Sequence, residues 1–194
     1  MSFDQAFIHL GAPTLCGIKP GNLFSINKEM LYHKGKLFSK FQSDFSKEGI
    51  KVALLNGSNN KILFFVYNEN LIKKLILEED TRNYLQSKGY KSFDKTEKIL
   101  SEVLKKICKK QDFPHEIGIF LGYPLNDVIQ YEKNKGSNCK YTGCWKSYSN
   151  VEYAIKTKEL FRNCSTKCLQ WYNQGSSISE LKQKFSNLVV NQNA

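Results

Sequence analysis

The feature that most constrains the fold is a pair of β-rich runs, "IKVALLN" and "KILFFVY", separated only by "GSNN". Residues 50–56 and 61–67 are rich in β-branched and aromatic side chains. A short connection that contains Gly and Asn is typical of an antiparallel hairpin. The chain is therefore predicted to contain a largely antiparallel sheet.

Segments with helical character surround this hairpin. Apolar residues recur at helical spacing between residues 93 and 110, and Pro124 is well placed to begin a helix. Helices are expected at residues 28–48, 69–79, 81–88, 93–110, 124–133, 151–172 and 177–186. Extended segments are expected within residues 12–26, around a Pro-Gly turn, and at 116–123 and 140–148.

Helices and strands alternate here without a regular βαβ rhythm, which favours the α+β class. We predict a single domain with a central, mostly antiparallel sheet of four or five strands and helices packed on it. The length of 194 residues suits one domain, and residues 187–194 are expected to form a loose tail. An apolar fraction of 41% is typical of a globular chain.

The formal net charge of +11 raises the question of a polyanionic partner. The chain has 27 Lys but only two Arg, Arg82 and Arg162. Arg is the preferred residue for bidentate contacts with phosphate and guanine. We therefore interpret the charge as solvated lysines under codon bias, with a lysine-driven nucleic-acid-binding module as an alternative function.

The first residues, "MSFDQAFIHLGAPTLCG", lack the basic region of a signal peptide, and no segment approaches the 18 apolar residues that a membrane span needs. We expect a cytoplasmic protein with no membrane span. Its six cysteines are then expected to be reduced.

The stretch "HEIGIFLGYPLND", residues 115–127, is the main candidate for a site. In a strand, Gly118 and Gly122 would lie on the same face as Glu116 and leave that face nearly bare. Either a helix or a ligand could approach the backbone there. The amides that follow Pro124 would add an anion-accepting helix end.

Three segments are predicted to converge on one anion-accepting pocket: "IKPGN" (18–22), "PHE" (114–116) and "GYP" (122–124). The candidate ligand-binding residues are Lys19, Asn22, His115, Glu116, Tyr123 and Lys146. The leading hypothesis is a protein that binds a small anionic ligand or a protein partner. The alternative is an enzyme in which His115 and Glu116 act as acid and base on a small anionic substrate.

The cysteines offer a further possibility. Cys139, Cys144, Cys164 and Cys168 could supply four thiolates to a metal, because Cys164 and Cys168 share one helical face. The simpler interpretation is that these residues are small core side chains, as we also expect for Cys16 and Cys108. No cofactor is predicted, and a metal or redox cofactor stays an open possibility.

The phrases "APTLCGIKPGNLFS", "FPHEIGIFLGYPLNDV" and "NKGSNCKYTGCWKSY" resemble the pattern of the clostridial-type domain of unknown function 3793 family, over about residues 8–182. The chain departs from that pattern at Cys16, Gly21, Cys144 and Ser147. The resemblance implies no established activity. It hints at a link with redox or iron metabolism.

Overall fold

The computed structural model describes residues 1–32, 45–46, 48–57, 59–108 and 113–192. The chain divides into two compact units. The first unit comprises Met1–Asn68 and Leu160–Ala194, and the second comprises Glu69–Glu159. The single domain expected from the chain length stays a prediction.

The first unit contains a three-stranded antiparallel sheet. Its strands are β1 (Gly21–Asn27), β2 (Ile50–Asn56) and β3 (Lys61–Asn68), in the spatial order β1-β3-β2. The hairpin predicted from the sequence is confirmed, since Val52 pairs with Val66 and Leu54 with Phe64. The α+β class and the antiparallel pairing are confirmed as well.

The expected sheet of four or five strands is wrong, because two expected strands take other forms. Residues 117–120 are helical. The segment 140–148 folds back on itself as a separate two-stranded sheet of β4 (Tyr141–Thr142) and β5 (Lys146–Ser147). A backbone hydrogen bond of 2.9 Å from Gly143 N to Trp145 O closes the turn between them.

Helix α1 (Phe3–Leu15) occupies part of the region expected to be extended. Ser2 and Gln5 form a capping box that satisfies two backbone N–H groups at its N-terminus. Pro13 lies in the last turn of this helix. Pro20 directly precedes β1, which begins at Gly21. The carbonyl oxygen of Pro20 accepts a hydrogen bond of 2.8 Å from the Asn68 amide.

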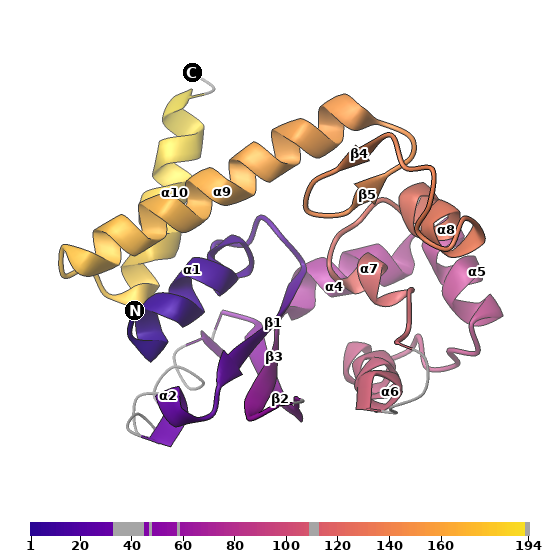
Figure 1. The fold of residues 1–194 in the computed structure, drawn as a ribbon, viewed down its shortest axis with the longest axis horizontal. Coiled ribbons are helices and arrows are strands. Elements are labelled where there is room, and N and C mark those ends of the chain that lie inside the picture. Colours follow the sequence, from indigo (N-terminus) through magenta and orange to yellow (C-terminus); the bar gives the residue numbers. More distant parts are fainter. Residues whose placement is uncertain (33–44, 47, 58, 109–112, 193–194) are drawn as a thin grey trace. The chain divides into compact units, whose positions relative to one another are not determined.

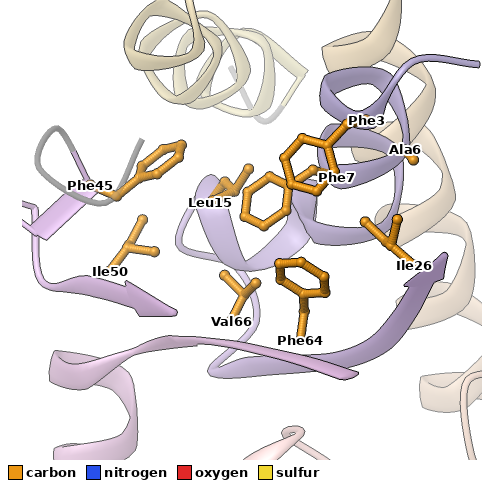
Figure 2. Packing of buried hydrophobic residues seen from close by; sticks show 9 residues of the cluster. All are labelled: Phe3, Ala6, Phe7, Leu15, Ile26, Phe45, Ile50, Phe64 and Val66. Atoms are coloured by element: carbon orange, nitrogen blue, oxygen red, sulfur yellow. The ribbon is translucent and has the colours of Figure 1, made fainter. Parts of the chain in front are cut away.

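One face of α1 packs on the sheet and forms the core of the first unit (Figure 2). Phe3 and Phe7 of α1 meet Phe64 of β3, with ring centroids 5.9 Å and 6.0 Å from that of Phe64. Burying a side chain of this size stabilises the fold by about 1.5–3 kcal/mol. These contacts fix the orientation of α1 over the strands.

The other face of α1 meets two C-terminal helices, α9 (Val151–Asn173) and α10 (Ile178–Gln192). In Figure 1, α1 lies between the sheet and these helices within the first unit. Ile8 and Ala12 pack there against Leu181 and Phe185. Helix α10 continues to Gln192, through the segment expected to form a loose tail.

Helices dominate the second unit. Besides the part of α9 up to Glu159, they are α4 (Glu69–Leu77), α5 (Glu79–Ser87), α6 (Thr96–Cys108), α7 (Ile117–Phe120) and α8 (Leu125–Lys133). Four of these match predicted helices, with α6 beginning a few residues later than expected. The helix predicted at 28–48 is described only in part, as α2 (Glu29–Tyr32), and its residues 33–44 lie outside the described residues. Among the described helices, none combines the length and the apolar character that crossing a membrane requires.

Candidate functional site

The central stretch forms a tight helical turn in place of the expected strand. The Tyr123 amide donates to Gly118 O and the Gly122 amide donates to Ile119 O, each at 2.8 Å. This pair of bonds is the Schellman closure of a helix C-terminus, which places Gly122 in the left-handed region with φ +77°. The chain then turns at Pro124 into α8.

The second glycine of this stretch has a different role. A Cβ atom on Gly118 would lie 2.9 Å from Val128 Cγ2 and 3.0 Å from Tyr123 Cδ2. Gly118 therefore lets the Tyr123 ring lie directly on α7. The sequence predicted that a helix or a ligand approaches the backbone at these glycines. At Gly118 the groups that approach are side chains of the chain itself, Val128 and Tyr123.

Around this turn the second unit encloses a cavity of about 360 Å³. Aromatic rings dominate its wall. Tyr123 stacks on Trp145 with ring centroids 5.4 Å apart, and burial raises the pKa of Tyr123 to about 12, so its phenol stays neutral. The lining residues are Phe113, His115, Ile117, Gly118, Leu121, Tyr123, Asp127, Val128, Tyr131, Thr142, Gly143, Cys144, Trp145 and Lys146.

Asp127 holds this wall in place. Its Oδ2 accepts a hydrogen bond of 2.6 Å from Trp145 Nε1. Its Oδ1 accepts from the amides of Tyr148 and Ser149, at 2.9 Å and 3.1 Å, and from the Ser149 hydroxyl at 2.9 Å. Burial raises the pKa of Asp127, but these hydrogen bonds outweigh burial and bring the pKa below its ordinary value. The ionised carboxylate therefore ties the β4–β5 hairpin to the first turn of α8.

One side of the cavity carries cationic and titratable groups. Lys146 Nζ donates to Gly136 O at 2.7 Å and lies 6.0 Å from the centroid of the Tyr131 ring. The His115 ring meets the same tyrosine edge-on, with centroids 5.2 Å apart. His115, Tyr131 and Lys146 thus form one polar rim beside the aromatic wall.

Glu116 has a different environment from its neighbour His115. Glu116 is 7% exposed, and its carboxylate accepts hydrogen bonds from Lys106 Nζ at 2.8 Å and from the Tyr90 hydroxyl at 3.2 Å. Burial and the Glu116 charge raise the pKa of Tyr90 above its ordinary value. Glu116 is not among the described residues that line the cavity. It joins α7 to α6 through an ion pair.

A family model described as "Protein of unknown function (DUF3793)" matches residues 7–182. The chain belongs to the DUF3793 family. This confirms the resemblance that the three sequence phrases carry, and the match spans most of both units. No curated protein and no solved structure matches the chain significantly.

The predicted site residues of this DUF3793 chain are divided between the two units. His115, Tyr123 and Lys146 line the cavity of the second unit. Lys19 and Asn22 belong to the first unit, where both are buried. Lys19 Nζ lies 5.3 Å from the centroid of the Phe161 ring, and Asn22 Nδ2 donates to Leu10 O. Their convergence with the other residues on one pocket stays a prediction.

The four cysteines considered as metal ligands are likewise divided. Cys144 lines the cavity of the second unit, and Cys139 Sγ lies 3.5 Å from Thr142 Oγ1. Cys164 and Cys168 are fully buried in the first unit, where they meet Cys16. The described residues thus bring together three thiols, and this set differs from the four cysteines that were considered, but not favoured, as metal ligands.

Sequence reasoning did not find the roles of Asp127 and Tyr131. A signal for both was available, because Asp127 and Tyr131 are four residues apart and share one face of that helix. What the sequence does not show is that this face turns toward the β4–β5 hairpin.

Proposed function

We propose that this protein binds a small anionic molecule with a flat, conjugated part in the cavity of the second unit. The observation that carries the proposal is the composition of the cavity wall. Tyr123 and Trp145 form an aromatic surface, and Lys146 and His115 lie beside Tyr131 at its rim. This combination suits a ligand that stacks through one part and carries negative charge on another.

The size of the cavity supports a ligand of this kind. Its volume of about 360 Å³ lies at the lower end of the range that small-molecule sites occupy, roughly 300–1,000 Å³. Such sites are mostly apolar and use a few polar groups to orient the ligand. A ligand of one or two fused rings with a single acidic group fits this description.

The charges around the cavity also favour an anion. Lys146 has three N–H donors, and the hydrogen bond to Gly136 O uses one of them. Asp127 is the acidic residue among the described lining residues, and its oxygen atoms already accept hydrogen bonds from Trp145, Tyr148 and Ser149. Its oxygen atoms are therefore occupied by protein donors, while the Lys146 ammonium can still donate to a ligand.

Binding of anilinonaphthalene sulfonate, an anion with a flat naphthalene part, tests the proposal against its uncharged parent anilinonaphthalene. We expect saturable binding of the sulfonate at one site per chain. Lys146→Met should weaken that binding by roughly tenfold to a hundredfold, because a hydrogen bond to a charged group contributes roughly 1.5–3 kcal/mol. Binding of the uncharged compound should change little. Fluorescence of the Trp171→Phe variant, which leaves Trp145 as the remaining tryptophan, reports occupancy of the cavity.

The matched control is Lys156→Met, since Lys156 pairs with Glu152 on an exposed face of α9. It removes the same charge from the chain but leaves the cavity unchanged. Equal losses of sulfonate affinity in the two variants would mean that the probe responds to net charge alone, and the proposed site would be wrong.

The two alternatives have less support. An enzyme that uses His115 and Glu116 together would need the Glu116 carboxylate to leave its ion pair with Lys106. A nucleic-acid-binding module would require affinity that falls steeply with salt, which a titration at several salt concentrations would detect. A protein partner in place of a small ligand, and the link with redox or iron metabolism, stay predictions.

A further inference from the structure

The first unit brings three buried thiols to one point. The Sγ atoms of Cys16, Cys164 and Cys168 all lie within 4.8 Å of one another, and those of Cys16 and Cys168 are 3.4 Å apart. Their exposed fractions are 6%, 0% and 0%. All three are free thiols.

Two elements that are distant in the sequence supply these sulfurs. Cys164 and Cys168 are one helical turn apart on α9, so they lie on the same face. Cys16 caps the C-terminus of α1, 152 residues before Cys168. The contact of α1 with α9 therefore closes the cluster from the opposite side.

The surroundings of the cluster are apolar. Ile8, Ala12, Leu181 and Phe185 pack around the three cysteines. Isolated buried cysteines often serve as small apolar side chains. That role requires a small volume, but it does not require three sulfur atoms to turn toward the same point. Sulfur atoms this close to one another can also bind one metal ion together.

We propose that Cys16, Cys164 and Cys168 bind one Cu(I) ion through their three sulfur atoms. When thiolates bind one metal at about 2.3 Å, their sulfur atoms lie roughly 3.8–4.0 Å apart. The three sulfurs of this cluster already lie within 4.8 Å of one another, so small side-chain rotations would complete the site.

The number and type of ligands select Cu(I) over Zn(II). Soft thiolate ligands suit Cu(I), and three of them form a complete trigonal shell for this ion. Zn(II) in structural sites takes four ligands, and with three it keeps an open position for water. Among the described residues the ligand group contains three cysteines, and their burial leaves little access for water.

The site has a structural consequence for the first unit. A metal held by Cys16 on one side and by Cys164 and Cys168 on the other would link α1 directly to α9. Binding to the folded chain would then stabilise the unit against unfolding.

Anaerobic titration of the reduced, full-length protein with Cu(I), in competition with the chelator bicinchoninate, tests this proposal. We expect one Cu(I) per chain, a higher unfolding temperature with copper, and only sulfur neighbours in the copper X-ray absorption spectrum. Cys16→Ala, Cys164→Ala and Cys168→Ala should each lower the affinity by at least about a hundredfold, a larger loss than outer-shell changes usually cause. Circular dichroism checks that each variant is folded.

Cys108→Ala is the matched control, because Cys108 is exposed. It should bind copper like the unchanged protein. An equal loss in Cys108→Ala and Cys168→Ala would overturn the proposal, as would displacement of the copper by equimolar Zn(II). The unchanged protein provides a test that needs no variant. If it forms a Cys16–Cys168 disulfide and, after reduction of that disulfide, takes up no Cu(I), the proposal is wrong.

Discussion

The aromatic cavity of the second unit and the thiol cluster of the first unit are assembled in opposite ways. The residues that line the cavity all lie between Phe113 and Lys146, and short hydrogen bonds within that stretch shape it. The thiol cluster joins Cys16 to Cys168, which are 152 residues apart. Apolar packing of α1 against α9 and α10 brings these two residues together, and hydrogen bonds from Gln5 to Asn173 and from Tyr172 to Asp4 add to it.

This difference predicts which substitutions disrupt each site. The cavity depends on a few local polar contacts, above all those of Asp127. The cluster depends on the packing of α1 against α9 and α10, to which many side chains contribute. A single polar substitution should therefore damage the cavity and leave the cluster intact.

The largest effect should come from Asp127→Ala. This change removes the acceptor of four hydrogen bonds and leaves the Trp145 indole N–H and the Tyr148 and Ser149 amides without it. We expect a loss of about 3 kcal/mol or more in the free energy of unfolding, because each buried, unsatisfied polar group costs roughly 1–3 kcal/mol. Urea denaturation measures this loss.

Glu152→Gln provides the comparison for Asp127→Ala. Glu152 forms an exposed ion pair with Lys156 on α9, and such pairs contribute about 0.2–1 kcal/mol. Asp127→Ala should also abolish binding of the sulfonate probe but leave Cu(I) binding unchanged. If copper binding fell together with probe binding, the contrast between a local and a long-range site would be lost.

A smaller effect should separate the two glycines of the central stretch. Gly118→Ala places a Cβ against Val128 and Tyr123, which should cost about 1–3 kcal/mol and weaken probe binding as the Tyr123 ring moves. Gly122→Ala places a Cβ on a residue with left-handed backbone conformation, which should lower the free energy of unfolding by about 1–2 kcal/mol. It adds no atom to the space between Gly118, Val128 and Tyr123. Urea denaturation and probe titration of both variants provide the measurements.

Val128→Ala combined with Gly118→Ala should recover part of the lost stability, because it removes one of the two clashing groups. It should recover none in combination with Gly122→Ala. Equal behaviour of the two pairs would contradict the separate roles assigned to the glycines.

The smallest effect should be a pH dependence of stability. The folded state holds the pKa of Asp127 below its ordinary value, so the ionised carboxylate stabilises the fold above that ordinary value. This contribution is lost as the pH falls through the lowered pKa. Urea midpoints measured from about pH 7 to about pH 3 should fall less in Asp127→Asn than in the unchanged protein.

A second carboxylate, Glu132, should also contribute to the pH dependence of stability. Hydrogen bonding from Lys88 lowers the pKa of Glu132, so Glu132→Gln should remove a separate part of the same acid sensitivity. If Asp127→Asn kept the full pH dependence, the carboxylate would not be ionised in the folded state as we infer.

Local interactions explain which parts of the fold could be predicted. The β2–β3 hairpin and helices α4, α5 and α8 follow from residues that are neighbours in the chain. The strand predicted at residues 116–123 is wrong, because an apolar run with two glycines suits a buried strand as well as a short helix closed by a glycine. Only the bonds to Gly118 O and Ile119 O distinguish the two.

The amino-acid sequence by itself determined the hairpin, most helices, the family and the presence of unusual glycines at 118 and 122. Tertiary structure alone decided that Asp127 meets Trp145 and that Cys16 meets Cys164 and Cys168. The physical reason is that periodicity reveals which face of an element is apolar, but not which element covers that face. That choice depends on the packing of the whole unit.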